Sequence, residues 1–152
     1  MIYTTIDEAF ENQIDPAVLE RTAANVLADQ SDGEEFDLTI AIEDDQNLHD
    51  LNLQFLGIDA PTDVLSFPAQ ETDPETGHLY LGDVIISLPR AAAQAQSAGH
   101  PLQNEVQLLI IHGILHLLGH DHATPETKDA MWQLQASLLD KLAIQINKLP
   151  EE

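Results

Sequence analysis

The stretch that decides the fold is His112-Gly113-Ile114-Leu115-His116-Leu117-Leu118-Gly119-His120-Asp121-His122. It completes an apolar run that starts at Leu102, and this run predicts a helix over residues 102–118. A helix that is apolar on almost every side has to be buried, so the segment is expected at the centre of the core. Gly119 ends the helix, because glycine accepts the backbone turn that follows many helices.

Three histidines of this stretch have the spacing of a metal site. His112 and His116 stand one helical turn apart, so both rings project from one face and can share an ion. His122 can return to the same ion from the turn after the helix. Buried imidazoles need a hydrogen bond or a ligand, and the chain has no cysteine to offer instead. We predict one Zn²⁺ per chain on these three residues, although imidazole also suits nickel and cobalt.

The same spacing indicates a hydrolase. Three neutral imidazoles leave a tetrahedral zinc ion one position for water, which can lose a proton near neutral pH and act as the nucleophile. The pattern H-x-x-x-H-x-x-G-x-x-H is that of the metzincin proteases, but Gly113 stands where those enzymes carry their Glu base. Two alternatives remain open: a zinc peptidase of metzincin-like type, and a non-catalytic zinc-binding module with a fourth protein ligand.

Outside the histidine segment, strands alternate with helices. Apolar runs predict strands at residues 2–6, 36–43, 64–67 and 79–88. Helical spacing and capping residues predict further helices at residues 15–29, 48–56, 87–98 and 124–146. The order of strands mixed with helices, followed by helices alone, favours one α+β domain over residues 1–152 with about four strands.

Composition and charge limit the function classes. Of the 152 residues, 43% are hydrophobic and 21% are charged, which is typical of a globular protein. No apolar run has the length of a membrane span, and Met1–Phe10 is unlike a signal peptide because it has acids and no basic residue. We therefore expect a cytoplasmic protein with no membrane partner.

The formal net charge of −22 repels nucleic acid at long range and favours solubility. The acidic residues are unevenly distributed along the chain. Residues 78–122 contain only Asp83, Glu105 and Asp121 against Arg90. A bound Zn²⁺ would make this segment about neutral, because the charge of the ion counts. The excess of acid therefore mostly avoids the candidate site.

Residues 112–122 resemble the signature of the YbeY endoribonucleases, bacterial zinc proteins of ribosomal RNA maturation. Two more segments fit the resemblance, Pro61-Thr62-Asp63-Val64-Leu65-Ser66-Phe67-Pro68 and Leu81-Gly82-Asp83-Val84-Ile85-Ile86-Ser87. The resemblance implies a four-stranded mixed sheet, a zinc helix beneath a cleft, and zinc on His112, His116 and His122. It also implies a single-strand-specific endoribonuclease acting in ribosomal RNA maturation and ribosome quality control. Its partners would be single-stranded or ribosomal RNA and the ribosome or ribosomal proteins.

One family residue is missing. The family usually carries an Arg a few residues before the Thr-Asp-Val-Leu-Ser-Phe segment, and that position is Leu56 here. Leu offers nothing like the planar donor fork with which Arg binds a phosphate. Arg90 is the candidate that could bind the substrate in its place.

Three aspartates are candidates to work beside the zinc-bound water. Asp63 could orient a ligand or cap a turn, and Asp121 could accept a proton or cap the loop after the helix. Asp83 lies in an apolar strand, where it could orient a ligating histidine or form a structural pair. Of the residues outside this set, Glu105 is expected to be a solvated acid at the helix start, and Trp132 a core residue.

Overall fold

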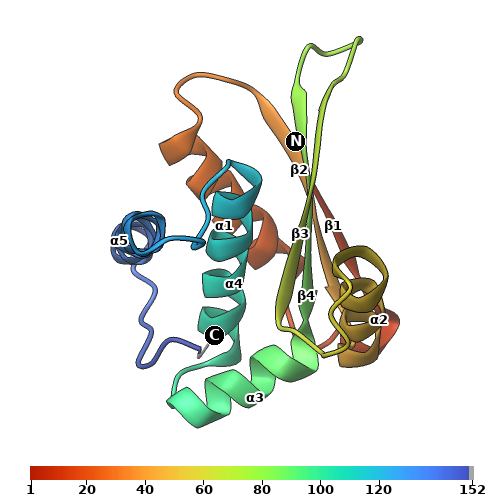
Figure 1. Cartoon of the computed structure of the whole chain (residues 1–152), viewed down its shortest axis with the longest axis vertical. Coiled ribbons are helices and arrows are strands. Elements are labelled where there is room, and N and C mark those ends of the chain that lie inside the picture. The colour runs from red at the N-terminus through yellow and green to blue at the C-terminus, as the bar shows by residue number, and fades with distance from the viewer. Residues whose placement is uncertain (151–152) are drawn as a thin grey trace.

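A four-stranded mixed sheet forms the middle of the computed structural model, which describes residues 1–150 (Figure 1). The strands are β1 (Ile2–Ile6), β2 (Phe36–Glu43), β3 (Val64–Thr72) and β4 (Leu79–Ser87). Their order is β1-β2-β4-β3, with β1, β2 and β4 parallel and β3 antiparallel at one edge. The predicted α+β fold with a four-stranded mixed sheet is confirmed.

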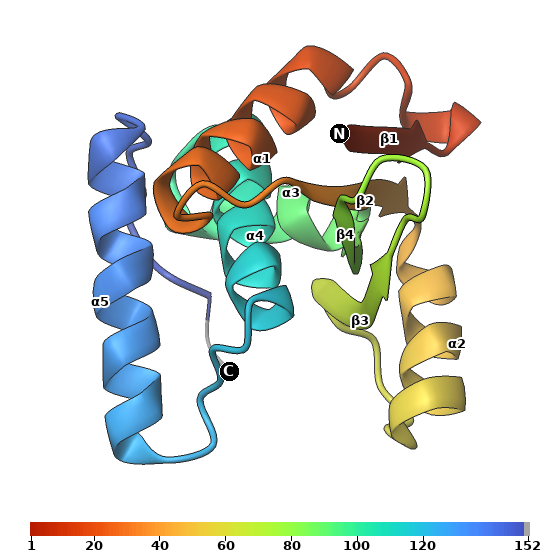
Figure 2. The same ribbon diagram turned by 90° about the horizontal axis from the view of Figure 1, so that it is seen from above.

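Helices cover both faces of the sheet. They are α1 (Pro16–Gln30), α2 (Asp45–Leu56), α3 (Leu88–Ala98), α4 (Leu102–Leu117) and α5 (Pro125–Lys141), with a short 3₁₀ turn at Glu8–Phe10. Seen from above, α2 lies on one side of the sheet, and α1, α4 and α5 lie on the other (Figure 2). Helix α4 contacts the sheet through β3 and β4 and also contacts α1, α3 and α5, so it is the centre of the fold.

The burial of α4 follows from its sequence. Ile110, Ile111 and Ile114 are completely buried, and burying each such side chain contributes about 1.5–3 kcal/mol. The stripe that carries His112 and His116 is partly open, as is the first turn of the helix around the exposed Gln103. The expected buried helix is therefore confirmed, ending one residue early at Leu117.

Three elements differ from their predicted bounds by more than one residue. Helix α2 begins at Asp45, ahead of the predicted residue 48. Strand β3 continues to Thr72, past Pro68, because β3 is an edge strand and a proline there removes no ladder hydrogen bond from the interior of the sheet. Helix α5 ends at Lys141, before the predicted residue 146, and Ala143 then turns the chain with a φ of +56°. Within residues 1–150, no helix is both long and apolar enough to cross a membrane.

The pairing of β3 with β4 requires a glycine at residue 82. Gly82 has a φ of +136°, and a Cβ atom there would lie 2.1 Å from the backbone oxygen of Phe67. We expect Gly82→Ala to lower the free energy of unfolding by about 1–3 kcal/mol more than a glycine substitution without that clash, because the strands must move apart. Urea unfolding followed by circular dichroism measures the difference.

The matched control is Gly77→Ala at the tip of the β3–β4 hairpin. Gly77 has a φ of +77° and open space where the Cβ would lie, so only the backbone strain of about 1–2 kcal/mol applies. Equal losses in the two variants would contradict the steric argument for Gly82.

Candidate metal centre

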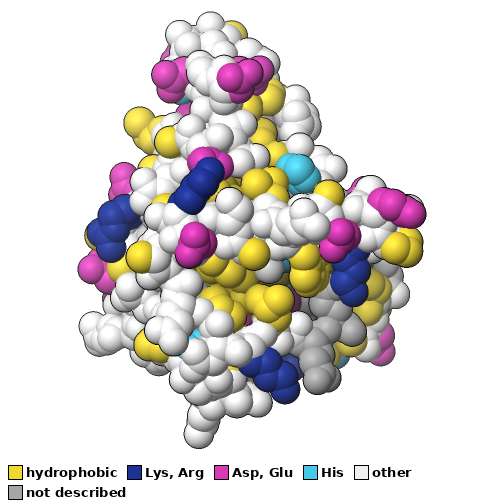
Figure 3. Space-filling model, turned by 90° about the vertical axis from the view of Figure 1, so that its left-hand side faces the viewer, with side chains coloured by type: hydrophobic (Ala, Val, Ile, Leu, Met, Phe, Trp, Pro, Cys, Tyr) yellow, Lys and Arg dark blue, Asp and Glu magenta, His cyan; other side chains and the backbone are white. Residues whose placement is uncertain are grey.

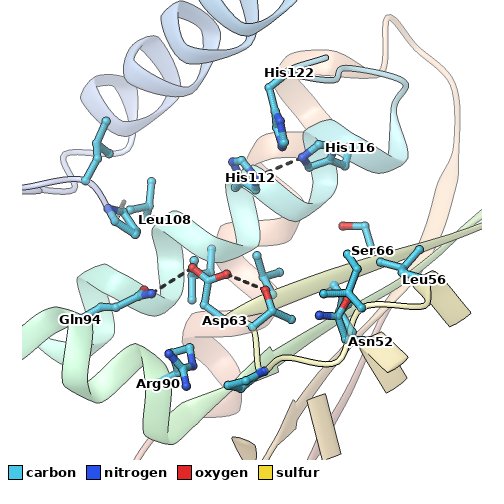
Figure 4. Close-up of a pocket in the computed structure, with 18 of the residues that line it drawn as sticks. Asn52, Leu56, Asp63, Ser66, Arg90, Gln94, Leu108, His112, His116 and His122 are labelled. Atoms are coloured by element: carbon cyan, nitrogen blue, oxygen red, sulfur yellow. Dashed lines mark hydrogen bonds between the residues drawn. The ribbon is translucent and has the colours of Figure 1, made fainter. Parts of the chain in front are cut away.

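The three predicted histidines meet in space. His112 and His116 project from α4, and His122 reaches them from the loop that follows Gly119 (Figure 4). One ring nitrogen from each lies within 4.8 Å of the others. The Nε2 atoms of His112 and His116 are 3.1 Å apart. Two nitrogens bound to one tetrahedral zinc at 2.0–2.1 Å lie roughly 3.3 Å apart, so the donor set fits such an ion.

Hydrogen bonds set the direction of two rings. The Nδ1–H of His112 donates to the side-chain oxygen of Gln135 on α5 at 3.0 Å, which directs Nε2 towards the other histidines. His116 makes a hydrogen bond with the backbone of His120. Ligating histidines usually have such a partner on the second nitrogen, and it fixes the tautomer. The imidazole of His120 itself lies outside the group of three within the described residues.

The surroundings of His116 keep its ring neutral. Burial, followed by the nearby His112 and His122 rings, lowers the pKa of His116 to about 4, against a weaker opposing effect of the His120 backbone. A metal binds the neutral imidazole, so no proton has to be displaced from His116 at neutral pH. The local environment therefore prepares this residue as a ligand.

Trp132 packs against the hydrophobic core, as the sequence indicated, and it also forms a wall of the site. Its ring contacts His112 and His122 edge-on, with centroids 5.5 and 5.8 Å away. The side chain is half-buried and also lines the neighbouring cavity. Both Trp132 and Gln135 come from α5, which brings an apolar wall and a polar anchor to the same three rings.

The histidines open into a cavity of about 760 Å³. Its walls come from the end of α2, the loop before β3, and helices α3, α4 and α5. The histidines lie at one end, and Asp63, Gln94 and Arg90 lie towards the other (Figure 4). The volume is in the range of small-molecule and cofactor sites. A ligand in this cavity would touch the candidate metal ligands and the polar group around Asp63 together.

Gly113 lets α4 lie directly against the sheet. A Cβ atom at this position would be 2.6 Å from Val84 and 3.3 Å from the Ser66 hydroxyl. That hydroxyl donates to the Gly113 carbonyl at 2.9 Å. A glutamate would not fit here without moving the helix away from β3 and β4. The lack of the protease carboxylate is therefore built into the packing of this fold.

The three candidate aspartates lie in different places. Asp63 lines the cavity together with the histidines. Asp121 is exposed and accepts the Ala123 N–H at 3.2 Å, and this hydrogen bond is the largest cause of its lowered pKa. Asp121 thus caps the turn that carries His122.

Asp83 points away from the site. Val84 faces Gly113 on α4, and neighbouring side chains of a strand point to opposite faces. The Asp83 carboxylate accepts the Tyr80 hydroxyl at 2.5 Å, and burial together with this carboxylate raises the pKa of Tyr80 to about 12. The expectation that Asp83 orients a ligating histidine is therefore corrected, since the residue forms a structural pair instead.

Arg90 and Leu56 both reach the cavity wall. The Nε and Nη2 of Arg90 donate to the two carboxylate oxygens of Asp45 at 2.9 and 3.1 Å, so its charge is largely offset. Leu56 is 56% exposed at the end of α2. The position at which the resemblance implies an Arg thus lies on the cavity wall and contributes an apolar side chain here.

The mixed sheet, the buried helix and the three convergent imidazoles define a class of α+β protein built around a candidate metal centre. Within that class, the family described as Endoribonuclease YbeY matches residues 4–143, and the chain belongs to this family. The membership confirms the resemblance that the histidine, Thr-Asp-Val-Leu-Ser-Phe and Leu-Gly-Asp-Val segments indicated.

Several curated relatives carry the same name, Endoribonuclease YbeY. The protein of Pelotomaculum thermopropionicum is 44% identical over 140 residues, which cover 90% of this chain and 89% of that protein. The protein of a Sulfurihydrogenibium species is 48% identical over 114 residues, which cover 72% of each chain. A Thermotoga maritima protein known from its solution structure has a TM-score of 0.58 at 23% identity, covers 94% of this chain and 92% of its own, and shares the fold.

The contact between Gln135 and His112 can be tested by metal affinity. We expect Gln135→Leu to weaken metal binding by roughly 10–100-fold, the usual effect of losing a partner of a ligating histidine. His116→Ala removes a ligand and should abolish tight binding of about one ion per chain. Competition titration with a chromophoric chelator measures both.

Gln133→Leu is the matched control, because Gln133 is exposed on the same helix and bonds only Asp129 at 3.1 Å among the contacts described. The control should bind the metal as the natural protein does. An unchanged affinity in Gln135→Leu would show that the hydrogen bond to His112 does not orient a ligand.

Proposed function

We propose that the protein is a zinc-dependent, single-strand-specific endoribonuclease of the cytoplasm that acts in ribosomal RNA maturation and ribosome quality control. One observation carries the proposal: in a member of an endoribonuclease family, three convergent imidazoles open into a cavity that also holds Asp63. The zinc ion would be held by His112, His116 and His122. Imidazole donors suit zinc, and the spacing of their nitrogens supports a single ion.

When bound, zinc supplies Lewis acidity and lowers the pKa of water towards neutrality. The protein groups around it would hold and orient the reacting parts. Gln135 keeps the His112 ring in its ligating orientation. Asp63 is the proposed proton acceptor, because it is the candidate aspartate that lines the cavity with the histidines. A general base has to enter the space that the reacting groups occupy, and neither Asp83 nor Asp121 lines this cavity.

A peptidase is the less favoured alternative. The base of a metzincin protease follows the first histidine, and here that position is Gly113 against Val84. The chain therefore has no carboxylate where peptide hydrolysis by that mechanism requires one.

The protein should hold RNA weakly when alone. The chain has five Lys and Arg residues against 27 Asp and Glu residues, and the basic ones stand apart from one another on the face shown in Figure 3. Arg90, which lines the cavity, is paired with Asp45. An acidic surface is complementary to a basic partner, so we propose that the ribosome or a ribosomal protein delivers the RNA.

The reaction can be tested directly. We expect the zinc-loaded protein to cut single-stranded RNA and to leave peptides uncut. His112→Ala should no longer cut RNA, because a metal ligand is gone. In Asp63→Asn the rate of RNA cleavage should fall by about 10²–10⁴-fold, the typical contribution of a general base. Gel analysis of labelled RNA with and without a chelator measures this. If peptides were cut in a chelator-sensitive way while the RNA stayed uncut, the proposal would be wrong.

The role of residue 56 can be tested by restoring the family arginine. Leu56→Arg should tighten single-stranded RNA binding by about 1–3 kcal/mol, the range for hydrogen bonds to charged groups. It should also steepen the slope of log affinity against log salt concentration by about one, because one more counterion is released from the RNA. Fluorescence anisotropy at several salt concentrations measures both quantities.

Leu53→Arg adds the same charge on the same helix at a residue that is 48% exposed and outside the cavity lining. It should change binding much less. Equal gains in the two variants would mean that added charge alone acts, and that the position of residue 56 has no special part in phosphate binding.

A further inference from the structure

A buried acid and histidine lie below the candidate site. Glu105 on α4 is completely buried, in contrast to the solvated position expected from the sequence. His100, in the turn between α3 and α4, is 6% exposed. The Nε2 of His100 lies 2.6 Å from Oε1 of Glu105. A buried carboxyl group needs a hydrogen bond for each oxygen, and this contact serves one of them.

The hydrogen bonds of His100 define its charge. The backbone N–H of Asn147 donates to Nδ1 of His100 at 3.1 Å, so Nδ1 carries no proton. The proton of the neutral ring is then on Nε2, which donates to Glu105. Glu105 therefore has a neutral donor beside it, and no full positive charge from His100 stabilises its ionised form.

Two enclosed acceptor atoms have no hydrogen-bond partner within residues 1–150. They are Oε2 of Glu105 and Oε1 of Gln94, and both residues line the same small cavity of about 240 Å³. The amide nitrogen of Gln94 is already used, because it donates to Oδ2 of Asp63 at 3.3 Å. One proton on Oε2 of Glu105 would turn an acceptor into a donor and supply the partner that Gln94 lacks.

We propose that Glu105 is held as a neutral carboxylic acid whose proton fixes Gln94, and through Gln94 the Asp63 carboxylate, at the floor of the candidate site. Glu105 is thus a positioning residue for Asp63. Hydrogen bonds join His100 to Glu105 and Gln94 to Asp63, and the small cavity that Glu105 and Gln94 both line links the two pairs. Its significance for RNA cleavage rests on the function proposed above, whereas the protonation of Glu105 does not.

The charges around Glu105 agree with this state. Burial is the main cause that raises its pKa; the hydrogen bond from His100, and the charge that His100 carries when protonated, lower it, and the Asp63 carboxylate raises it by a smaller effect. Lys148 also lines the small cavity, but its side chain is exposed to solvent. Arg90, one turn before Gln94 on α3, is paired with Asp45.

Ionisation of Glu105 would disturb Asp63. Without its proton, Oε2 could only accept, so the Gln94 amide would have to turn its NH₂ group towards Glu105. Its oxygen would then face Oδ2 of Asp63, and two acceptors in contact repel each other. The hydrogen bond that holds Asp63 at the end of the cavity would be lost.

Glu105→Gln is the decisive variant, because a glutamine keeps the shape and has a permanent donor in place of the carboxyl proton. The natural protein should show the infrared carbonyl band of a protonated carboxylic acid at neutral pH, and Glu105→Gln should lack it. The exposed Glu20 on α1 provides the control, since Glu20→Gln should keep the band. The midpoint of thermal unfolding should change little in Glu105→Gln at neutral pH.

The pH profile gives a second measure. A carboxyl group with a raised pKa stabilises the fold at low pH, and this stability is lost as the pH rises through the raised pKa. This loss of stability at rising pH should be absent in Glu105→Gln. RNA cleavage by this variant should also continue to a higher pH than cleavage by the natural protein. An infrared spectrum without the acid band, or a Glu105→Gln melting temperature several degrees lower at neutral pH, would overturn the proposal. Absence of RNA cleavage with the band present would overturn the proposed function alone.

Discussion

The close packing of α4 on the sheet is the constraint on which the rest of the structure depends. Gly113 brings the helix against Val84, and Ser66 ties it to β3 through the Gly113 carbonyl. Because other helices cover the remaining sides, α4 has to be apolar almost all round. Polar groups on such a helix are costly unless each one has a partner, and this requirement shapes both the metal centre and the buried acid.

Three polar side chains of α4 find partners on different parts of the chain, although Oε2 of Glu105 has none within residues 1–150. His112 uses Gln135 of α5, His116 uses the His120 backbone, and Glu105 uses His100 from the preceding turn. The partners come from both sides of α4 in the sequence. These three partners lie in the C-terminal half of the chain, and both His112 and Gln135 line the cavity beside the loop before β3.

Local patterns explain what could be predicted from the sequence. The histidine spacing identified the candidate ligands because it follows from helix geometry, and the caps Asp15, Ser87 and Thr124 marked helix starts that the structure confirms. Gln135 and Gln94 had no such signal, because glutamines on an amphipathic helix are common and their partners lie far along the chain. Glu105 was misplaced for the same reason: only the three-dimensional packing shows that its helix start is covered.

The contact between Gly113 and Val84 also limits the evolutionary paths open to this scaffold. A metzincin protease with the same histidine spacing carries Glu where this chain has Gly113. The Cβ atom of that Glu would already overlap the sheet. A lineage could not exchange one chemistry for the other by a single replacement, since the helix would first have to move outward and its buried face be rebuilt. The two kinds of enzyme are thus neighbours in sequence pattern but are separated by a change in architecture.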